Sequence, residues 1–452
     1  MKITFLGAAE TVTGSKYLLE FEKKKILIDC GLFQGHKEMR ERNWEDFFID
    51  PRDIDALILT HAHIDHSGYI PLLVKKGFCG KIFCSPATFD LCKILLLDSG
   101  FLQEEDAMRA NKYGYTKHKP ALPLYTKDDA EFSLQFFQSV NFDEIFHFDQ
   151  NINFTLNRAG HILGASFITL TYNGESIVFS GDLGRESDPI TKVPTKLSNA
   201  DYLLIESTYG NRLHEKTDPA EIIKNAIIKT AARGGVVVIP AFAVGRAQNI
   251  MYYIEQLKEQ KAIPEIPVFL DSPMAIEASK ILQKNQSEHK LGKELCQKVC
   301  DVARYTASVE ESKALNEIKM PMIIISASGM AEGGRVLHHL KNYISNHRNT
   351  ILFTGFQAQG TRGDKIVSGY KTIKIHGQIF EINAEIINLT CGSAHADYEE
   401  ILSWLSNFKK APKKVFITHG SLESATSLQE KIKEKFGWNA IIPKYLQSEN
   451  LK

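Results

Sequence analysis

Short apolar and β-branched runs separated by turn residues fill the part of the chain before Tyr209. Runs of this kind predict strands, here at residues 2–6, 16–21, 25–29, 56–60, 82–84, 154–159, 167–172, 176–180 and 202–206. Helices are expected after Ile70 and after Pro86, because proline suits the first turn of a helix. This part of the chain therefore combines many short strands with a few helices.

After Tyr209 the pattern changes to an alternation of strands and helices. Strand-like runs at residues 236–239, 268–270, 322–326 and 351–353 alternate with helical stretches after Pro219, Arg246, Met274, Glu310 and Gly334. Such alternation predicts parallel βαβ units and hence a separate doubly wound domain. The tail adds a helix at residues 399–408, a strand at 414–418, a helix at 424–436 and a last strand near Ile441.

Composition narrows the class of protein. The 452 residues are 43% hydrophobic and 24% charged, with a formal net charge of zero, which is ordinary for a globular domain. No apolar run reaches the ~18 residues of a membrane helix, so we expect no membrane partner. The seven cysteines are scattered without a CxxC pair, which argues against a disulfide scaffold and favours the cytoplasm. Because the net charge is zero, any binding of nucleic acid requires a local patch.

The strongest chemical signal is an HxHxDH sequence at residues 61–66, directly after the expected strand 56–60. Its members His61, His63, Asp65 and His66 are four metal-ligand side chains within six positions. Imidazole and carboxylate groups suit zinc, and without a cation these groups would repel one another or lack partners. A polar loop with surface histidines is the alternative, and the density of ligands argues against it.

Single histidines and aspartates at other strand ends extend this site. His161, Asp182 and His419 each follow a strand-like run, so five imidazoles and two carboxylates are available for two cations. Asp182 can bridge the two cations through its two oxygens, and Asp29 is expected to orient a ligand from behind. Two cations ~3.5–4 Å apart activate a water for hydrolysis, and this chemistry by itself does not choose between phosphodiesters, lactams and thioesters.

Several motifs resemble the metallo-β-lactamase superfamily and its β-CASP branch of RNA-processing nucleases. Residues 7–15, 28–31, 61–66, His161 and 180–182 are similar to the hydrolase motifs, and residues 206–210, 393–397 and 418–420 to those of the branch. The resemblance implies an α/β protein in which an αββα hydrolase sandwich is interrupted by an inserted doubly wound β-CASP domain, with the active site between them. The implied domains are residues 1–207 and 391–452 for the sandwich and 208–390 for the insertion.

The resemblance also implies roles for individual residues. One zinc ion would bind His61, His63, His161 and Asp182, and a second would bind Asp65, His66, Asp182 and His419. His395 would be the general acid, oriented by Glu206, and Asp65 is counted with the catalytic group. A histidine at position 419 accompanies RNA substrates in the family. The segment at residues 353–361 looks more like the pre-mRNA 3′-end cleavage endonucleases than like ribonuclease J.

The expected enzyme is therefore a zinc-dependent, endonucleolytic ribonuclease acting on single-stranded or weakly structured RNA. A dinuclear-zinc hydrolase of small esters, lactones or thioesters is the alternative, and an inactive scaffold subunit is a third reading. Manganese or iron could replace zinc. The oligomeric state stays open, with a homodimer among the options.

Three further features are candidate substrate contacts. Ser328, Gly329 and Arg335 belong to a glycine-rich turn between a strand and a helix, and Arg246 opens another helix. Backbone N–H groups and arginines at such positions can bind phosphate, but a plain turn is equally expected. The basic, aromatic stretch at residues 112–119 could contact RNA by stacking and charge, and a solvated loop is the alternative.

Overall fold

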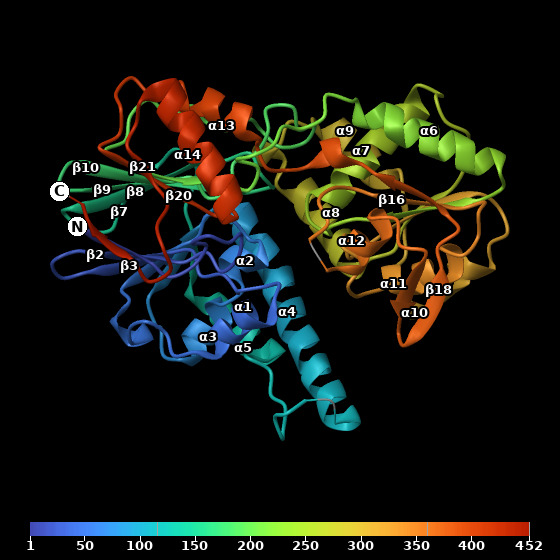
Figure 1. The fold of residues 1–452 in the computed structure, drawn as a ribbon, viewed down its shortest axis with the longest axis horizontal. Coiled ribbons are helices and arrows are strands. Elements are labelled where there is room, and N and C mark those ends of the chain that lie inside the picture. Colours follow the sequence, from blue (N-terminus) through green and yellow to red (C-terminus); the bar gives the residue numbers. More distant parts are fainter. Residues whose placement is uncertain (115, 359, 452) are drawn as a thin grey trace. The chain divides into compact units, whose positions relative to one another are not determined.

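The computed structural model describes residues 1–114, 116–358 and 360–451 (Figure 1). Tyr115, in the basic stretch 112–119, and Gln359, in the segment 353–361, lie outside the described residues. The chain forms two compact units: unit 1 consists of residues 1–213 and 395–452, and unit 2 of residues 214–394. Each unit is described by itself.

Unit 1 contains two seven-stranded sheets. The first has the order β22-β1-β2-β3-β4-β5-β6, with β22 (Ser448–Asn450), β1 (Lys2–Phe5), β2 (Tyr17–Glu20), β3 (Lys25–Ile28), β4 (Ala56–Ile58), β5 (Lys81–Cys84) and β6 (Phe137–Ser139). The second has the order β21-β20-β11-β10-β9-β8-β7, with β21 (Ala440–Ile441), β20 (Lys414–Thr418), β11 (Tyr202–Glu206), β10 (Glu175–Phe179), β9 (Ser166–Tyr172), β8 (Ile152–Arg158) and β7 (Ile145–His147).

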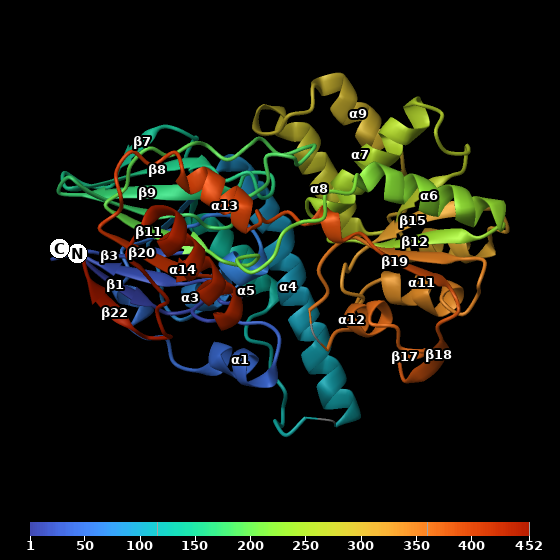
Figure 2. The ribbon, with the colours of Figure 1, turned by 45° about the horizontal axis from the view of Figure 1, so that its top comes forward.

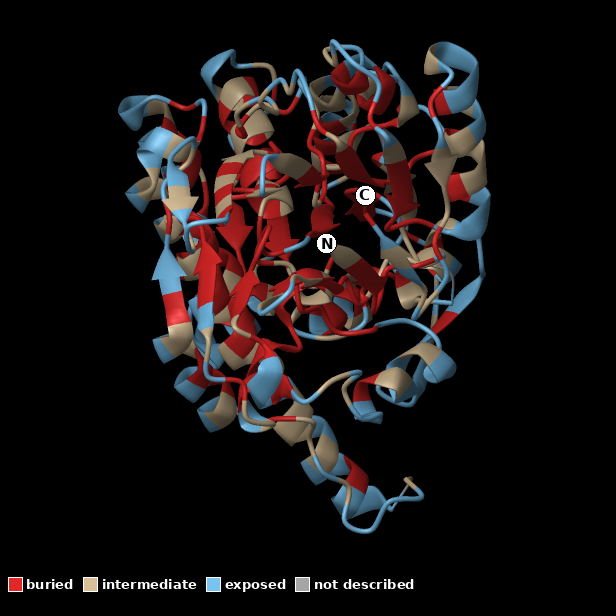
Figure 3. Ribbon diagram, turned by 90° about the vertical axis from the view of Figure 1, so that its left-hand side faces the viewer, coloured by how far each residue is buried: buried red, intermediate tan, exposed pale blue. Residues whose placement is uncertain are grey.

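The two sheets pack face to face over one hydrophobic core. Alternate residues of each strand point inward, so Phe5 of the first sheet meets Phe416 of the second at 5.2 Å between ring centroids. Phe83 and Phe154 make a similar contact at 5.5 Å. Buried residues predominate in the central strands, whereas exposed residues lie on the edge strands, loops and helices (Figure 3). This is an αββα sandwich, as predicted.

Helices cover the outer faces of the sandwich, with α13 and α14 on one side and α2, α3 and α5 on the other (Figure 1). The helices of unit 1 are α1 (Lys37–Glu41), α2 (Ile64–Ser67), α3 (Ile70–Lys75), α4 (Pro86–Tyr113), α5 (Lys127–Ser133), α13 (Tyr398–Leu405) and α14 (Leu422–Phe436). The 28-residue α4 begins at an N-cap formed by Ser85, whose hydroxyl accepts a hydrogen bond from the Thr88 N–H, and it ends at Gly114 in the left-handed conformation.

Unit 2 is built on a six-stranded parallel sheet. Its order is β14-β13-β15-β12-β16-β19, with β14 (Arg304–Tyr305), β13 (Val268–Leu270), β15 (Met322–Ser326), β12 (Val236–Pro240), β16 (Thr350–Phe353) and β19 (Glu385–Asn388). Figure 2 shows this sheet among its helices α6 (Pro219–Ala232), α7 (Arg246–Glu259), α8 (Pro273–Lys284), α9 (Lys293–Asp301), α10 (Val309–Ala314), α11 (Val336–Tyr343) and α12 (Arg362–Val367).

Both faces of this parallel sheet are buried. Val236 and Val238 of β12 belong to the core that includes α11, whereas Val237 and Ile239 are equally buried and point to the opposite face. Burial on both faces is typical of a doubly wound domain, so the predicted fold class is confirmed. The sequence pattern did not predict the hairpin of β17 (Thr372–Ile375) and β18 (Gln378–Glu381). Exposed polar residues occupy half of the positions in these two short strands. In the described part of the chain, no helix combines the length and apolar character that a membrane span needs.

Candidate metal centre

The predicted ligand loop lies at the carboxyl end of β4 in unit 1. The strand is fully buried, and the chain then turns through His61 and His63 into the short helix α2. His61 and His66 are buried, while His63 and Asp65 are partly exposed. A Cβ atom on Gly31 would lie 1.6 Å from the Asp65 carbonyl oxygen, so only glycine allows this close approach.

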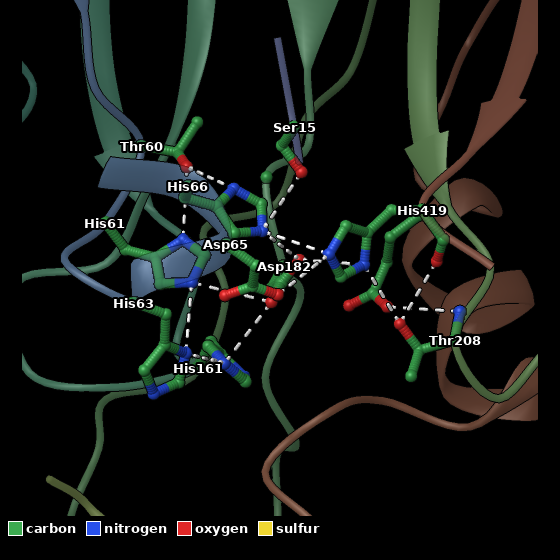
Figure 4. Close-up of polar contacts among 12 residues, drawn as sticks. Ser15, Thr60, His61, His63, Asp65, His66, His161, Asp182, Thr208 and His419 are labelled. Atoms are coloured by element: carbon green, nitrogen blue, oxygen red, sulfur yellow. Dashed lines mark hydrogen bonds and ion pairs between the residues drawn. The ribbon is translucent and has the colours of Figure 1, made fainter. Parts of the chain in front are cut away.

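A first group of ligands brings together His61, His63, His161 and Asp182 (Figure 4). Nδ1 of His63 lies 3.2 Å from Nε2 of His61 and 3.2 Å from Nε2 of His161. Oδ2 of Asp182 lies 3.5 Å from Nε2 of both His61 and His161. A tetrahedral zinc ion with bonds of ~2.0–2.1 Å would need ligand atoms about 3.3–3.4 Å apart. The four atoms therefore fit one tetrahedral cation.

A second group contains Asp65, His66 and His419. Nε2 of His419 lies 3.1 Å from Nε2 of His66 and 3.5 Å from Oδ2 of Asp65. The other oxygen of Asp182, Oδ1, lies 3.3 Å from Nε2 of His66 and 3.3 Å from Nδ1 of His419. The two oxygens of Asp182 thus face different groups, an arrangement that suits a carboxylate bridging two cations.

Pairing of strands in the second sheet brings together site residues that are distant in the sequence. They lie at the end of the sheet where the parallel strands have their carboxyl ends. β10, β11 and β20 run parallel, and Glu206 at the end of β11 is in register with Thr418 at the end of β20. The loops after these strands carry Asp182 and His419. A Cβ on Gly184 would lie 1.8 Å from the Gly160 carbonyl oxygen, so the loops carrying Asp182 and His161 also depend on glycine to meet.

Two residues at the site have left-handed backbone conformations that glycine would adopt more easily. Asp29 has φ +56° and His419 has φ +51°. Such conformations are sparsely populated for residues with a Cβ and persist where the surroundings hold them. The side chains of Asp29 and His419 are both buried against the ligand groups. The strained backbone places them there, and the surrounding contacts compensate for the strain.

Asp29 lies behind His66. The sequence analysis expected Asp29 to orient a metal ligand from such a position. Nδ1 of His66 donates to Oδ2 of Asp29 at 2.7 Å, and the backbone N–H and hydroxyl of Thr60 donate to the same carboxylate. Because Nδ1 carries the proton, the lone pair of Nε2 faces the second group of ligands. Thr60 was missed by the sequence analysis, although it directly precedes His61.

The electrostatics of the two groups favour a cation. Burial lowers the pKa of His61 and of His63, so both imidazoles are neutral. Burial acts to raise the pKa of Asp182, but the surrounding histidines, His419 and His66 foremost, hold it well below its usual range. Burial likewise lowers the pKa of His66, yet the carboxylates of Asp182 and Asp29 raise it well above its usual value.

His395 and Glu206 lie beside the first group. Nδ1 of His395 is 3.2 Å from each Glu206 oxygen and 3.8 Å from Oδ2 of Asp182. Burial acts to lower the pKa of His395, but the Glu206 and Asp182 carboxylates outweigh it and raise the pKa to about 9. Glu206 is itself fixed, because Oε1 accepts from the Leu183 N–H at 2.6 Å. The Glu206 carboxylate therefore orients the His395 ring and favours its charged form.

Thr208 and Ser15 are further residues that the sequence analysis did not single out. The Thr208 hydroxyl lies 3.2 Å from Nδ1 of His419, and the Ser15 hydroxyl lies 3.4 Å from Nε2 of His66. Both residues belong to motifs quoted for the family resemblance, and this was the only signal in the sequence. Their contacts orient ligand histidines.

The remaining predicted contacts, Ser328, Gly329, Arg335 and Arg246, lie in unit 2. The guanidinium of Arg335 donates to the buried carboxylate of Asp271 at 2.7 Å and to the carbonyls of Thr306 and Ala307. Through these contacts Arg335 stabilises the packing of neighbouring segments within unit 2.

The other three residues of this set are placed as follows. The Ser328 hydroxyl accepts from the Glu332 N–H at 3.2 Å, so it closes its own turn. Gly329 packs against Phe242, and a Cβ there would lie 2.9 Å from that ring. Arg246 is the first residue of α7. Contact of any of them with a substrate stays a prediction.

Family models match three parts of the chain. The description "Metallo-beta-lactamase superfamily" matches residues 11–223, "Beta-Casp domain" matches residues 247–366, and "Zn-dependent metallo-hydrolase RNA specificity domain" matches residues 379–443. The three matches follow one another along the chain and together span most of it.

Similar proteins are found in bacteria and archaea. "Ribonuclease TTHA0252" of Thermus thermophilus is 33% identical over 438 residues, which cover 95% of each chain. "Transcription termination factor FttA" of Methanosarcina mazei is 31% identical over 462 residues, covering 96% of this chain and 69% of that protein. A solved structure of a protein of unknown function from Enterococcus faecalis has a TM-score of 0.54 at 14% identity, covering 100% of this chain and 99% of that one, which supports the fold alone.

Proposed function

This chain belongs to the metallo-β-lactamase superfamily, in its β-CASP branch, and on that premise we propose that it is a metal-dependent ribonuclease. One observation carries the proposal: the two oxygens of Asp182 face two groups of ligands at distances that suit cations, with His395 beside them. The match to an RNA specificity domain and the likeness to a ribonuclease support RNA as the substrate. Hydrolysis of small esters, lactones or thioesters is not favoured by any of these observations.

We propose two zinc ions as the cofactor. His61, His63, His161 and Asp182 would hold one, and Asp65, His66, Asp182 and His419 would hold the other. When bound, the two ions supply a water of lowered pKa and positive charge next to the scissile phosphate. The mixture of imidazole and carboxylate donors fits zinc, and manganese or iron can also occupy such sites.

His395 would donate the proton to the leaving oxygen. Its Nδ1–H is held by the Glu206 carboxylate, which fixes the orientation of the imidazole. Loss of a proton to the leaving oxygen would yield a 3′-hydroxyl on one fragment and a 5′-phosphate on the other. Glu206 acts through His395 as a positioning residue, since its carboxylate keeps the imidazolium charged.

Asp65 would serve as a ligand and as a member of the catalytic group. Oδ2 of Asp65 contacts His419, and burial acts to raise the Asp65 pKa while the hydrogen bond with His419 lowers it below its usual value. The carboxylate is therefore ionised. Such a carboxylate would be able to accept a hydrogen bond from the attacking water.

The test is cleavage of a 5′-labelled single-stranded RNA by the zinc-loaded protein, with DNA of the same sequence as control. We expect RNA fragments with 5′-phosphate and 3′-hydroxyl ends, loss of cleavage with a chelator, and cleavage of a circular RNA if the enzyme acts endonucleolytically. An intact RNA together with rapid hydrolysis of a thioester or lactone would overturn the proposal.

A further inference from the structure

The distal part of α4 and the segment that returns from it form a projection from unit 1. We define the described residues of this projection, 107–114 and 116–122, as the arm. Among its described residues only Ala110 is buried. The large apolar side chains of Met108, Tyr113 and Leu122 are 61%, 68% and 64% exposed. These three side chains therefore lie outside the core of unit 1.

The arm is held in place by defined hydrogen bonds. The side chain of Asn111 donates to the Ala121 carbonyl at 2.9 Å and accepts from the Ala121 N–H at 2.7 Å. Nearer the sandwich, Gln103 accepts from the Leu124 N–H at 3.1 Å. The returning segment is thus hydrogen-bonded to the helix at Ala121 and at Leu124.

The arm is a local concentration of positive charge on a chain of zero net charge. It contains Arg109, Lys112, Lys117 and Lys119 and no aspartate or glutamate. Arg109 pairs with Glu105 at 3.2 Å, but the three lysines are exposed and form no ion pair with any residue that the structure describes. Three lysines without carboxylate partners favour the binding of a polyanion over the binding of a partner with an apolar or mixed-charge surface.

We propose that the arm is an auxiliary RNA-binding surface. It binds a part of the single-stranded substrate that lies at a distance from the metal centre. The inference rests on the proposed function, because it extends the same substrate. Lysine ammonium groups would contact phosphates, and the exposed Tyr113 ring would stack on a base. Proteins that bind single strands without reading sequence use this combination of charge and aromatic stacking.

The geometry of α4 sets how long the RNA must be. The hydroxyls of Ser85 and Thr88, at the start of the helix, donate to the Gly164 carbonyl at 2.7 and 2.8 Å, in the loop that carries His161. Twenty-eight residues at ~1.5 Å each place Tyr113 roughly 40 Å further along the helix. A stacked strand advances ~3.4 Å per nucleotide, so roughly a dozen nucleotides reach from the metal centre to the arm.

The test compares two triple variants. In the first, Lys112, Lys117 and Lys119 are changed to glutamine; in the control, the exposed lysines Lys409, Lys410 and Lys433 of the same unit are changed to glutamine. Binding of a 25-nucleotide single-stranded RNA is measured in a His395→Ala background at several salt concentrations. Cleavage of the 25-nucleotide RNA and of a 5-nucleotide RNA is measured with His395 intact.

We expect the arm variant to bind the long RNA ~10–100-fold more weakly at ~0.1 M salt, with a salt slope smaller by about 2, since each single-strand phosphate contact contributes ~0.7. Tyr113→Ala should weaken binding by ~5–100-fold, and Tyr113→Phe should restore it. Cleavage of the 5-nucleotide RNA should not change. The control variant should behave as the wild type does.

Unchanged binding and salt slope in the arm variant, or an equal loss in the control variant, would overturn the inference. So would a change in oligomeric state without a change in RNA binding, which would assign the arm to a protein partner. If the wild type cleaves neither RNA, the proposed function fails instead. Failure of this inference can thus be distinguished from failure of the proposed function. The inference is tested by RNA binding and by the difference in cleavage between the 25-nucleotide and the 5-nucleotide RNA.

Discussion

Both carboxylate oxygens of Glu206 lie 3.2 Å from Nδ1 of His395, although 189 positions separate the two residues in the chain. Glu206 ends a buried strand, and its own position is fixed by the Leu183 N–H. The contact therefore orients the imidazole and holds its proton, while the ligand groups lie next to it. On the proposed role of His395 as proton donor and not as ligand, we expect its loss to separate metal binding from catalysis.

His395→Ala should leave the metal content of the protein near that of the wild type and slow RNA cleavage by ~10²–10⁴, the usual range for a lost general acid. Elemental analysis of the purified protein and single-turnover cleavage measure the two effects. A matching loss of metal in this variant would show that His395 is a ligand.

His63→Ala should lower metal content and activity together, because Nδ1 of His63 is shared between two 3.2 Å contacts in the first ligand group. We expect about one ion per chain to be lost from a pair of sites. Elemental analysis after dialysis against metal-free buffer measures this loss. Retention of both ions would contradict the assignment of His63.

Asp182→Ala should be more severe than His63→Ala, since its two oxygens face different ligand groups. We expect both ions to be lost and cleavage to be abolished. The same elemental analysis compares the two variants directly. Loss of a single ion would mean that Asp182 belongs to one group only.

Asp29→Asn should weaken metal binding by ~10–100-fold while leaving the fold intact, because an amide has no negative charge and only one oxygen, whereas both Asp29 oxygens accept hydrogen bonds from His66 and Thr60. Competition with a chromogenic chelator measures the affinity. Asp53→Asn, at an exposed position of the same unit, is the matched control and should not change it. Equal affinities in both variants would exclude an orienting role for Asp29.

Asp271→Ala should destabilise unit 2 by ~3–5 kcal/mol at pH 7, because it leaves the Arg335 guanidinium without its buried carboxylate partner. Burial acts to raise the pKa of Asp271, but hydrogen bonds from His339, Ser312 and Arg335 lower it below its ordinary value. Because the folded pKa is depressed, this stabilisation is complete above ~4 and is lost as the pH falls through the lower, folded value.

Urea unfolding at pH 7 and at lower pH measures this difference between the wild type and Asp271→Ala. The free-energy difference should shrink as the pH falls below ~4. Glu265→Gln, at a highly exposed position, is the control and should not alter the unfolding free energy. A difference that stays constant across this pH range would contradict the assigned role of the carboxylate.

The alternation of strands and helices was enough to predict the doubly wound domain, because local periodicity reports which faces are buried, whereas the αββα sandwich was implied by the family resemblance. The strands at residues 25–28 and 202–206 were recognised from their apolar runs. The hairpin at residues 372–381 was not, because half of its side chains are exposed and polar. Its pairing depends on neighbours that a local pattern does not contain.

The sequence by itself determined the set of available ligands, since His61, His63, Asp65 and His66 lie within six positions and can converge through a single turn. Only the tertiary structure decided which oxygen of Asp182 faces which histidine, that Thr208 holds His419, and that Arg335 pairs with Asp271. These relations depend on the register of parallel strands and on loops meeting at glycines. Such contacts join residues up to hundreds of positions apart, and short-range patterns carry no information about them.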